Sequence, residues 1–97
     1  MTKVRVSEQV QACVKSLAPG PKRSLRLAIR GLAEDKGDIK PLEGSLSGWH
    51  RLRVGGYRVI FKQTLQKGIR TIDCVYVNRR SVVYDLFEEL AKDELIG

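Results

Sequence analysis

The sequence lacks the residue sets on which many enzymes depend. With a single histidine, His50, the 97-residue chain cannot assemble a Ser-His-Asp triad. It has no glycine-rich phosphate loop before a helix, no cluster of metal ligands and no carboxylate pair in a turn-rich segment. Its two cysteines, Cys13 and Cys74, have neither metal-ligand nor redox spacing, and their apolar neighbours predict small buried side chains. We therefore expect neither a metal nor a cofactor.

Long hydrophobic runs are also missing. No apolar stretch approaches the roughly 18 residues that a membrane-spanning helix needs. The N-terminal residues lack the apolar core of a signal peptide. We expect a cytoplasmic protein without membrane contact, and a length that suits one domain over residues 1–97.

Acidic residues are scarce in most of the chain. Residues 1–80 carry 17 basic and 6 acidic side chains, a net charge of +11, whereas residues 81–97 carry 1 basic and 5 acidic side chains, a net charge of −4. A basic body of this kind indicates a polyanionic partner, and a nucleic acid is the partner we expect. A lysine-rich solvated surface is the alternative interpretation, but here arginines gather in one segment.

That segment runs from Trp49 to Phe61 and predicts two antiparallel strands joined at Gly55-Gly56. Two glycines between alternating runs are a strong hairpin signal, because glycine accepts the positive φ of tight hairpin turns. The hairpin contains no acid to pair with its arginines. Alternation places Arg51 and Arg53 on one side of the first strand and His50 on the other.

The remaining elements follow from periodicity and turn signals. We expect a strand over Lys3–Val6, a helix after Ser7, a second helix over residues 22–36, a loop over residues 37–48, a third sheet strand over residues 69–77 and a helix from Val82 onward. The fold class is thus α+β, in the order β-α-α-β-β-β-α. It has a small antiparallel β-sheet, an N-terminal helical hairpin packed on one face and a C-terminal helix.

The arginines suit the chemistry of phosphodiesters. A guanidinium grips two phosphate oxygens at once and stabilises the charge of a phosphoryl-transfer transition state. RNA supplies its own nucleophile, the 2′-hydroxyl, so metal-free RNA cleavage is within reach. Arginine is a poor general base, however, because it keeps its proton at any ordinary pH. His50 has a suitable pKa range, but it lies on the opposite side of the strand.

The element order and three segments resemble the RelE/ParE superfamily of bacterial toxins. The segments are residues 40–44 (KPLEG), residues 49–58 (WHRLRVGGYR) and residues 78–84 (NRRSVVY). The resemblance covers nearly the whole chain. RelE-like members cleave mRNA in the ribosomal A site, so it implies a ribosome-dependent mRNA endoribonuclease that inhibits translation. It also implies a cognate antitoxin as partner.

The resemblance further implies residue roles. Arg51 and Arg53 match the basic strand residues that flank the scissile phosphate, and Arg58 matches the arginine that stabilises the transition state. Arg80 matches the arginine of the closing motif, and Tyr84 the tyrosine that stacks or relays a proton. This chain has Asn78 where many relatives have a histidine, so the general base stays open. We assign five further residues to RNA binding: Arg26, Arg30, His50, Lys62 and Arg79.

Two other functions share this pattern. A ParE-like toxin would bind DNA gyrase through the same fold and cleave nothing. A non-toxic module would hold RNA on its basic sheet. We expect an acidic, amphipathic antitoxin segment to cover the basic face or to displace the helix over residues 82–95 in either toxin.

Overall fold

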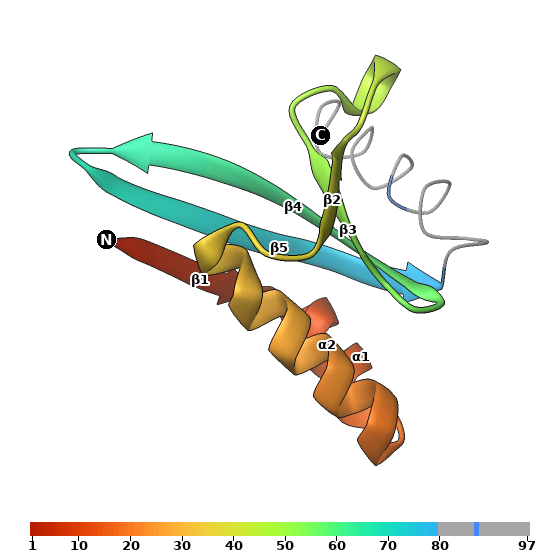
Figure 1. Ribbon diagram of the computed structural model, residues 1–97. Helices are drawn as coiled ribbons and strands as arrows, with labels where there is room; N and C mark the ends of the chain where they lie inside the picture. Colours follow the sequence, from red (N-terminus) through yellow and green to blue (C-terminus); the bar gives the residue numbers. More distant parts are fainter. Residues whose placement is uncertain (80–86, 88–97) are drawn as a thin grey trace.

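The computed structural model describes residues 1–79 and Phe87 (Figure 1). The elements are β1 (Thr2–Val6), α1 (Glu8–Ser16), α2 (Pro19–Gly31), the 3-10 helix η1 (Leu32–Glu34), β2 (Asp38–Pro41), the 3-10 helix η2 (Gly44–Leu46), β3 (His50–Val54), β4 (Tyr57–Gln66) and β5 (Ile69–Arg79). The expected strand, helical hairpin and three-stranded meander are confirmed. The helix expected from Val82 onward lies outside the described residues.

The helical hairpin begins and ends at residues with clear local roles. Ser7 caps α1 as predicted, since its hydroxyl oxygen accepts a hydrogen bond from the backbone N–H of Val10 at 3.2 Å. Helix α2 begins at Pro19, three residues before the predicted start, because proline at a first helical position loses no hydrogen bond. It ends at Gly31 rather than at Lys36, and η1 then turns the chain toward the sheet.

The described strands form one sheet in the order β1-β5-β4-β3-β2. Two expectations were wrong here. The segment predicted as a loop contains the edge strand β2, which pairs antiparallel with β3. Only Ile39 is apolar in this short strand, so alternation could not reveal it. The sheet is also mixed, because the helical hairpin returns the chain so that β1 runs parallel to β5.

Apolar side chains pack on both sides of the sheet. Helices α1 and α2 cover one side (Figure 1), and the main core between these layers includes Leu25, Leu52 and Phe61, each fully buried. Cys74 belongs to this core, as predicted, and burial raises the pKa of its thiol to about 12. Cys13 is partly buried and packs against the same core. The smaller cluster on the other side contains Leu46, Ile60, Tyr76 and Phe87.

A β-bulge changes the alternation within β5. Ile60 pairs with Tyr76, but the next residue, Phe61, pairs with Cys74, so Val75 is the extra residue. Regular strand alternation would place Tyr76 on the same side as Cys74. The bulge turns Tyr76 to the side opposite the helices, where it joins the smaller cluster. Among the described residues, no helix is long and apolar enough to cross a membrane.

Candidate functional site

We call the side of the sheet opposite α1 and α2 the arginine face. Leu52 and Val59 point into the main core, and strand alternation therefore directs Arg51, Arg53 and Arg58 to the other side. The predicted turn at Gly55-Gly56 joins β3 to β4, which pair in a continuous register from Val54 and Tyr57 onward. Gly55 has the positive φ, 58°, that such a turn requires. The hairpin thus gathers the three arginines that the sequence singled out.

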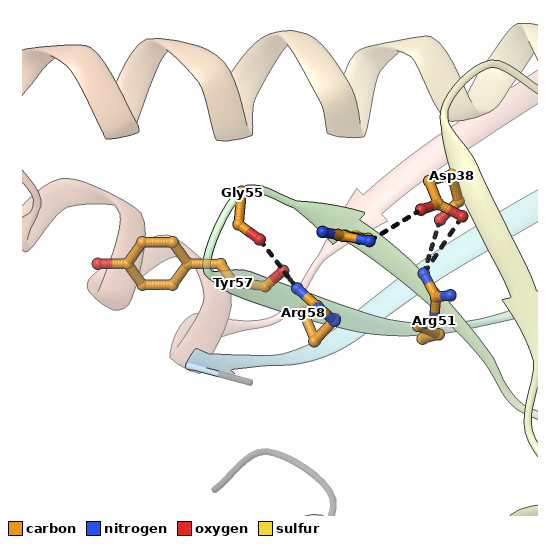
Figure 2. Close-up of polar contacts among 6 residues, drawn as sticks. Asp38, Arg51, Gly55, Tyr57 and Arg58 are labelled. Atoms are coloured by element: carbon orange, nitrogen blue, oxygen red, sulfur yellow. Dashed lines mark hydrogen bonds and ion pairs between the residues drawn. The ribbon is translucent and has the colours of Figure 1, made fainter. Parts of the chain in front are cut away.

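Arg51 is held by the edge strand. Its Nη1 donates a hydrogen bond to the backbone carbonyl of Asp38 at 3.2 Å and lies 3.4 Å from the Asp38 carboxylate (Figure 2). These contacts leave the Arg51 side chain 16% exposed. The position of one candidate RNA contact is therefore fixed by a residue that sequence analysis did not single out.

Arg53 and Arg58 stand directly opposite each other on β3 and β4. Two like charges facing each other across a strand pair destabilise a sheet. The Arg53 side chain is 55% exposed and lies 4.0 Å from the Asp38 carboxylate. It is therefore the most accessible guanidinium of the three and the one best placed to meet an incoming anion.

Arg58 is buried, with 5% of its surface exposed. Its Nη1 donates hydrogen bonds to the backbone carbonyls of Gly55 at 3.0 Å and Tyr57 at 2.9 Å (Figure 2). Both bonds connect the Arg58 side chain to the backbone of the hairpin turn. Arg58 therefore has a structural task in addition to the predicted contact with the transition state, which stays a prediction.

The bulge in β5 adds two polar groups to this face. Asn78 pairs with Arg58 across the strands, and its Nδ2 donates to the hydroxyl of Tyr76 at 3.2 Å. The Asn78 side-chain oxygen accepts the backbone N–H of Arg79 at 2.8 Å. Asn78 is thereby held beside Arg58. Regular alternation would have directed it away from the arginines, so only the bulge reveals this placement.

An aromatic group borders the arginine face near the start of β3. The rings of Trp49 and Phe87 meet edge to face, with centroids 4.9 Å apart. The ammonium group of Lys62 lies 5.0 Å from the centroid of the Trp49 ring, within the range of a cation–π contact. Lys62, assigned to RNA binding, therefore stays on the same side of the sheet as the arginines.

The other predicted RNA-binding residues are not gathered there. His50 stacks on Phe61 on the helix side, and its buried Nδ1 has no hydrogen-bond partner among the residues that the structure describes. Arg26 and Arg30 lie on α2, where they line a cavity of about 360 Å³ between the two helices and β1. Arg79 is exposed at the end of β5. The structure thus separates these four residues from the arginine face.

Two of the five predicted catalytic residues, Arg80 and Tyr84, lie outside the described residues. The structure also adds Asp38, which the sequence interpretation had placed in a loop. No signal along the chain links Asp38 to the arginines, because the link is a strand pairing that brings it opposite Arg53. The described site is therefore a cluster of three arginines with one acid at its edge.

Solved structures that are similar to this chain include a toxin and components of toxin–antitoxin complexes. A YoeB/ParE toxin from Agrobacterium tumefaciens is 12% identical, with a TM-score of 0.67 over 80% of this chain and 98% of that one. The archaeal RelE-RelB complex from Pyrococcus horikoshii contains a chain that is 25% identical, with a TM-score of 0.63 over 81% of this chain and 94% of that one. A chain of the RelBE2 toxin-antitoxin complex from Mycobacterium tuberculosis is 21% identical, with a TM-score of 0.65 over 81% of this chain and 91% of that one.

These similarities lie in structure rather than in sequence. No protein-family model and no curated protein sequence matches the chain. The class that the fold defines is a small α+β fold with a five-stranded mixed sheet. Within that class the chain is RelE/ParE-like, as its sequence motifs implied.

Proposed function

We propose that this chain is the toxin of a type II toxin–antitoxin system and acts as a ribosome-dependent mRNA endoribonuclease. The observation that carries the proposal is the convergence of Arg51, Arg53 and Arg58 on one face of the sheet. Guanidinium groups gathered on one face suit a phosphodiester, because one carboxylate, Asp38, balances only part of their positive charge. This proposal includes a cytoplasmic location, where mRNA and ribosomes are found.

In the proposed reaction the RNA 2′-hydroxyl attacks the adjacent phosphorus atom. The bond from phosphorus to the 5′-oxygen of the next nucleotide breaks, and a 2′,3′-cyclic phosphate and a 5′-hydroxyl form. Arg51 and Arg53 would hold the non-bridging oxygens, while Arg58 would stabilise their charge in the transition state. We assign proton transfer or base stacking to Tyr84 and a further phosphate contact to Arg80, as the resemblance implies.

The proposed RNA contacts extend beyond the arginine face. Lys62 would meet the same strand of RNA as the three arginines, a role supported by its position on the same side of the sheet. Arg26, Arg30 and Arg79 would instead meet a second segment of RNA, as expected for a protein enclosed by the ribosomal A site. His50 is the least suited of the assigned residues, because it stacks within the fold.

The proposed partner that restrains the toxin is a cognate antitoxin. The similar chains from Pyrococcus horikoshii and Mycobacterium tuberculosis are components of complexes with antitoxins. An acidic, amphipathic antitoxin segment would complement the positive charge of residues 1–80. Covering the arginine face with such a segment would prevent RNA from entering.

A second function remains in competition, namely inhibition of DNA gyrase by protein binding. The observation that favours it is that no histidine lies among the described residues of the arginine face, while the nearby carboxylate of Asp38 is engaged in ion pairs with Arg51 and Arg53. His50 lies on the other side of the sheet, and Asn78 cannot accept a proton at neutral pH. In this case the arginines would contact acidic groups of the gyrase surface.

Parallel assays separate the two functions. Purified toxin is added to a cell-free translation reaction and, separately, to a gyrase supercoiling reaction. A double variant, Arg51→Ala with Arg53→Ala, serves as comparison in both. We expect the wild type to stop translation and the double variant to be at least about a hundredfold weaker, since each lost contact acts on the transition state. Inhibited supercoiling with unaffected translation would replace the endoribonuclease proposal with the gyrase proposal.

A further inference from the structure

Asp38 occupies a distinctive position beside the proposed phosphate site. It stands directly opposite Arg53 on the edge strand β2, and its carboxylate lies 3.4 Å from Nη1 of Arg51 and 4.0 Å from Nη1 of Arg53. Figure 2 shows the Asp38 and Arg51 side chains turned toward each other. One carboxylate therefore interacts with both arginines that are proposed to hold the phosphate.

The surroundings of Asp38 are otherwise cationic. Arg51 faces Lys40 across β2 and β3, and Arg53 faces Arg58 across β3 and β4. Each of these facing pairs joins two positive charges, which destabilises the sheet. Among the described residues, Asp38 is the one acid that forms an ion pair with these cations. Asp38 therefore neutralises part of the positive charge of the arginine cluster.

The two arginines differ in how firmly Asp38 holds them. Arg51 makes both the ion pair and the hydrogen bond to the Asp38 backbone carbonyl, and its side chain is 16% exposed. Within the described part of the chain, Arg53 makes only the longer ion pair with Asp38, and its side chain is 55% exposed. One guanidinium is thus kept in place, while the other is free to turn toward a ligand.

We propose that Asp38 is a positioning residue that fixes Arg51 and opposes the binding of RNA phosphate. This inference rests on the proposed function. A phosphate that approaches Arg51 and Arg53 meets the carboxylate that already interacts with both, so binding requires the arginines to exchange one anion for another. Asp38 accordingly weakens RNA binding in the ground state while it keeps Arg51 in the geometry that the reaction needs.

The test compares Asp38→Asn with a matched control. Asn keeps the size of the side chain and removes its charge. Glu34→Gln removes the same charge from an exposed ion pair with Lys36, outside the arginine cluster. Asp38→Glu restores the charge. Binding is measured with short single-stranded RNA that carries 2′-O-methyl groups, so that it cannot be cleaved. Turnover is measured on unmodified mRNA with ribosomes.

For Asp38→Asn we expect roughly fivefold tighter RNA binding, because an exposed ion pair is worth up to about 1 kcal/mol. The salt dependence of binding should steepen, since an additional positive charge becomes available to phosphate. The kcat value should fall by about tenfold while KM decreases, because Arg51 loses its fixed position. Asp38→Glu should return the RNA affinity toward the wild-type value. Glu34→Gln should change neither the RNA affinity nor kcat.

Equal RNA affinities for Asp38→Asn and Glu34→Gln would overturn the inference. Tighter binding with an unchanged kcat would overturn the positioning role of Asp38. A different result would contradict the proposed function: a wild-type protein that binds the modified RNA but cuts no mRNA on ribosomes. The change in affinity would then still support the action of Asp38 on phosphate binding.

Discussion

Arg53 and Arg58 show how two residues of the same type, facing each other, can have different tasks. Arg53 is largely exposed and makes one long ion pair. Arg58 is buried and donates hydrogen bonds to two backbone carbonyls of the hairpin turn. The sequence indicated only that both belong to one basic cluster. Their burial separates a residue that is free to bind a ligand from one that also supports the fold.

Substitution of the two arginines should therefore change stability to different extents. Arg58→Ala should lower the free energy of unfolding by about 1–3 kcal/mol, because it leaves two turn carbonyls without their donor. Arg53→Ala should change it by no more than about 0.5 kcal/mol, as is usual for an exposed side chain. Urea unfolding of both variants measures the difference. Equal losses of stability would contradict the assignment of Arg58 to the turn.

At the scale of elements, the sequence predicted the helices and strands that have a regular pattern of apolar residues. The helical hairpin and the meander follow from apolar periodicity and from the Gly55-Gly56 turn, and both are confirmed. The strand β2 escaped prediction because Ile39 is its one inward apolar residue. The bulge at Val75 also escaped, because a single inserted residue leaves no pattern of its own. Both features contribute to the site, since β2 brings Asp38 and the bulge brings Asn78.

The start of β2 provides a test at this scale. Gly37 has a φ of 109°, and a Cβ added there would lie 2.7 Å from Cδ1 of the buried Leu52. We expect Gly37→Ala to destabilise the protein by about 1–3 kcal/mol through backbone strain. Gly20 in α2 has open space around it, so Gly20→Ala should instead stabilise the protein by about 0.4–1 kcal/mol.

Thermal unfolding of both glycine variants distinguishes these effects. The Gly37 variant should also lose mRNA cleavage, because β2 carries the Asp38 contacts that hold Arg51 in position. A Gly37→Ala protein as stable as the wild type would show that the chain does not need this backbone conformation to enter β2.

At the scale of the whole molecule, the two sides of the sheet have separate tasks. The helices cover one side and form the main core with it (Figure 1). The other side has a small apolar cluster, which leaves the β3–β4 hairpin available for a polar site. The fold is shared with toxins that differ greatly in sequence, with identities of 12–25%. The function must therefore be derived from the residues on the arginine face.

We propose above that the arginine face cleaves mRNA on the ribosome. The most direct test of this claim is to map new RNA 5′ ends by primer extension after adding the protein to a translating reporter mRNA, with naked RNA in parallel. Arg53→Ala is compared with the wild type, and Lys36→Ala, at an exposed surface ion pair, is the charge-matched control. We predict ribosome-dependent cuts for the wild type and Lys36→Ala, and roughly a hundredfold fewer for Arg53→Ala. Arrested translation without new 5′ ends, or cuts that persist undiminished in Arg53→Ala, would contradict the claim.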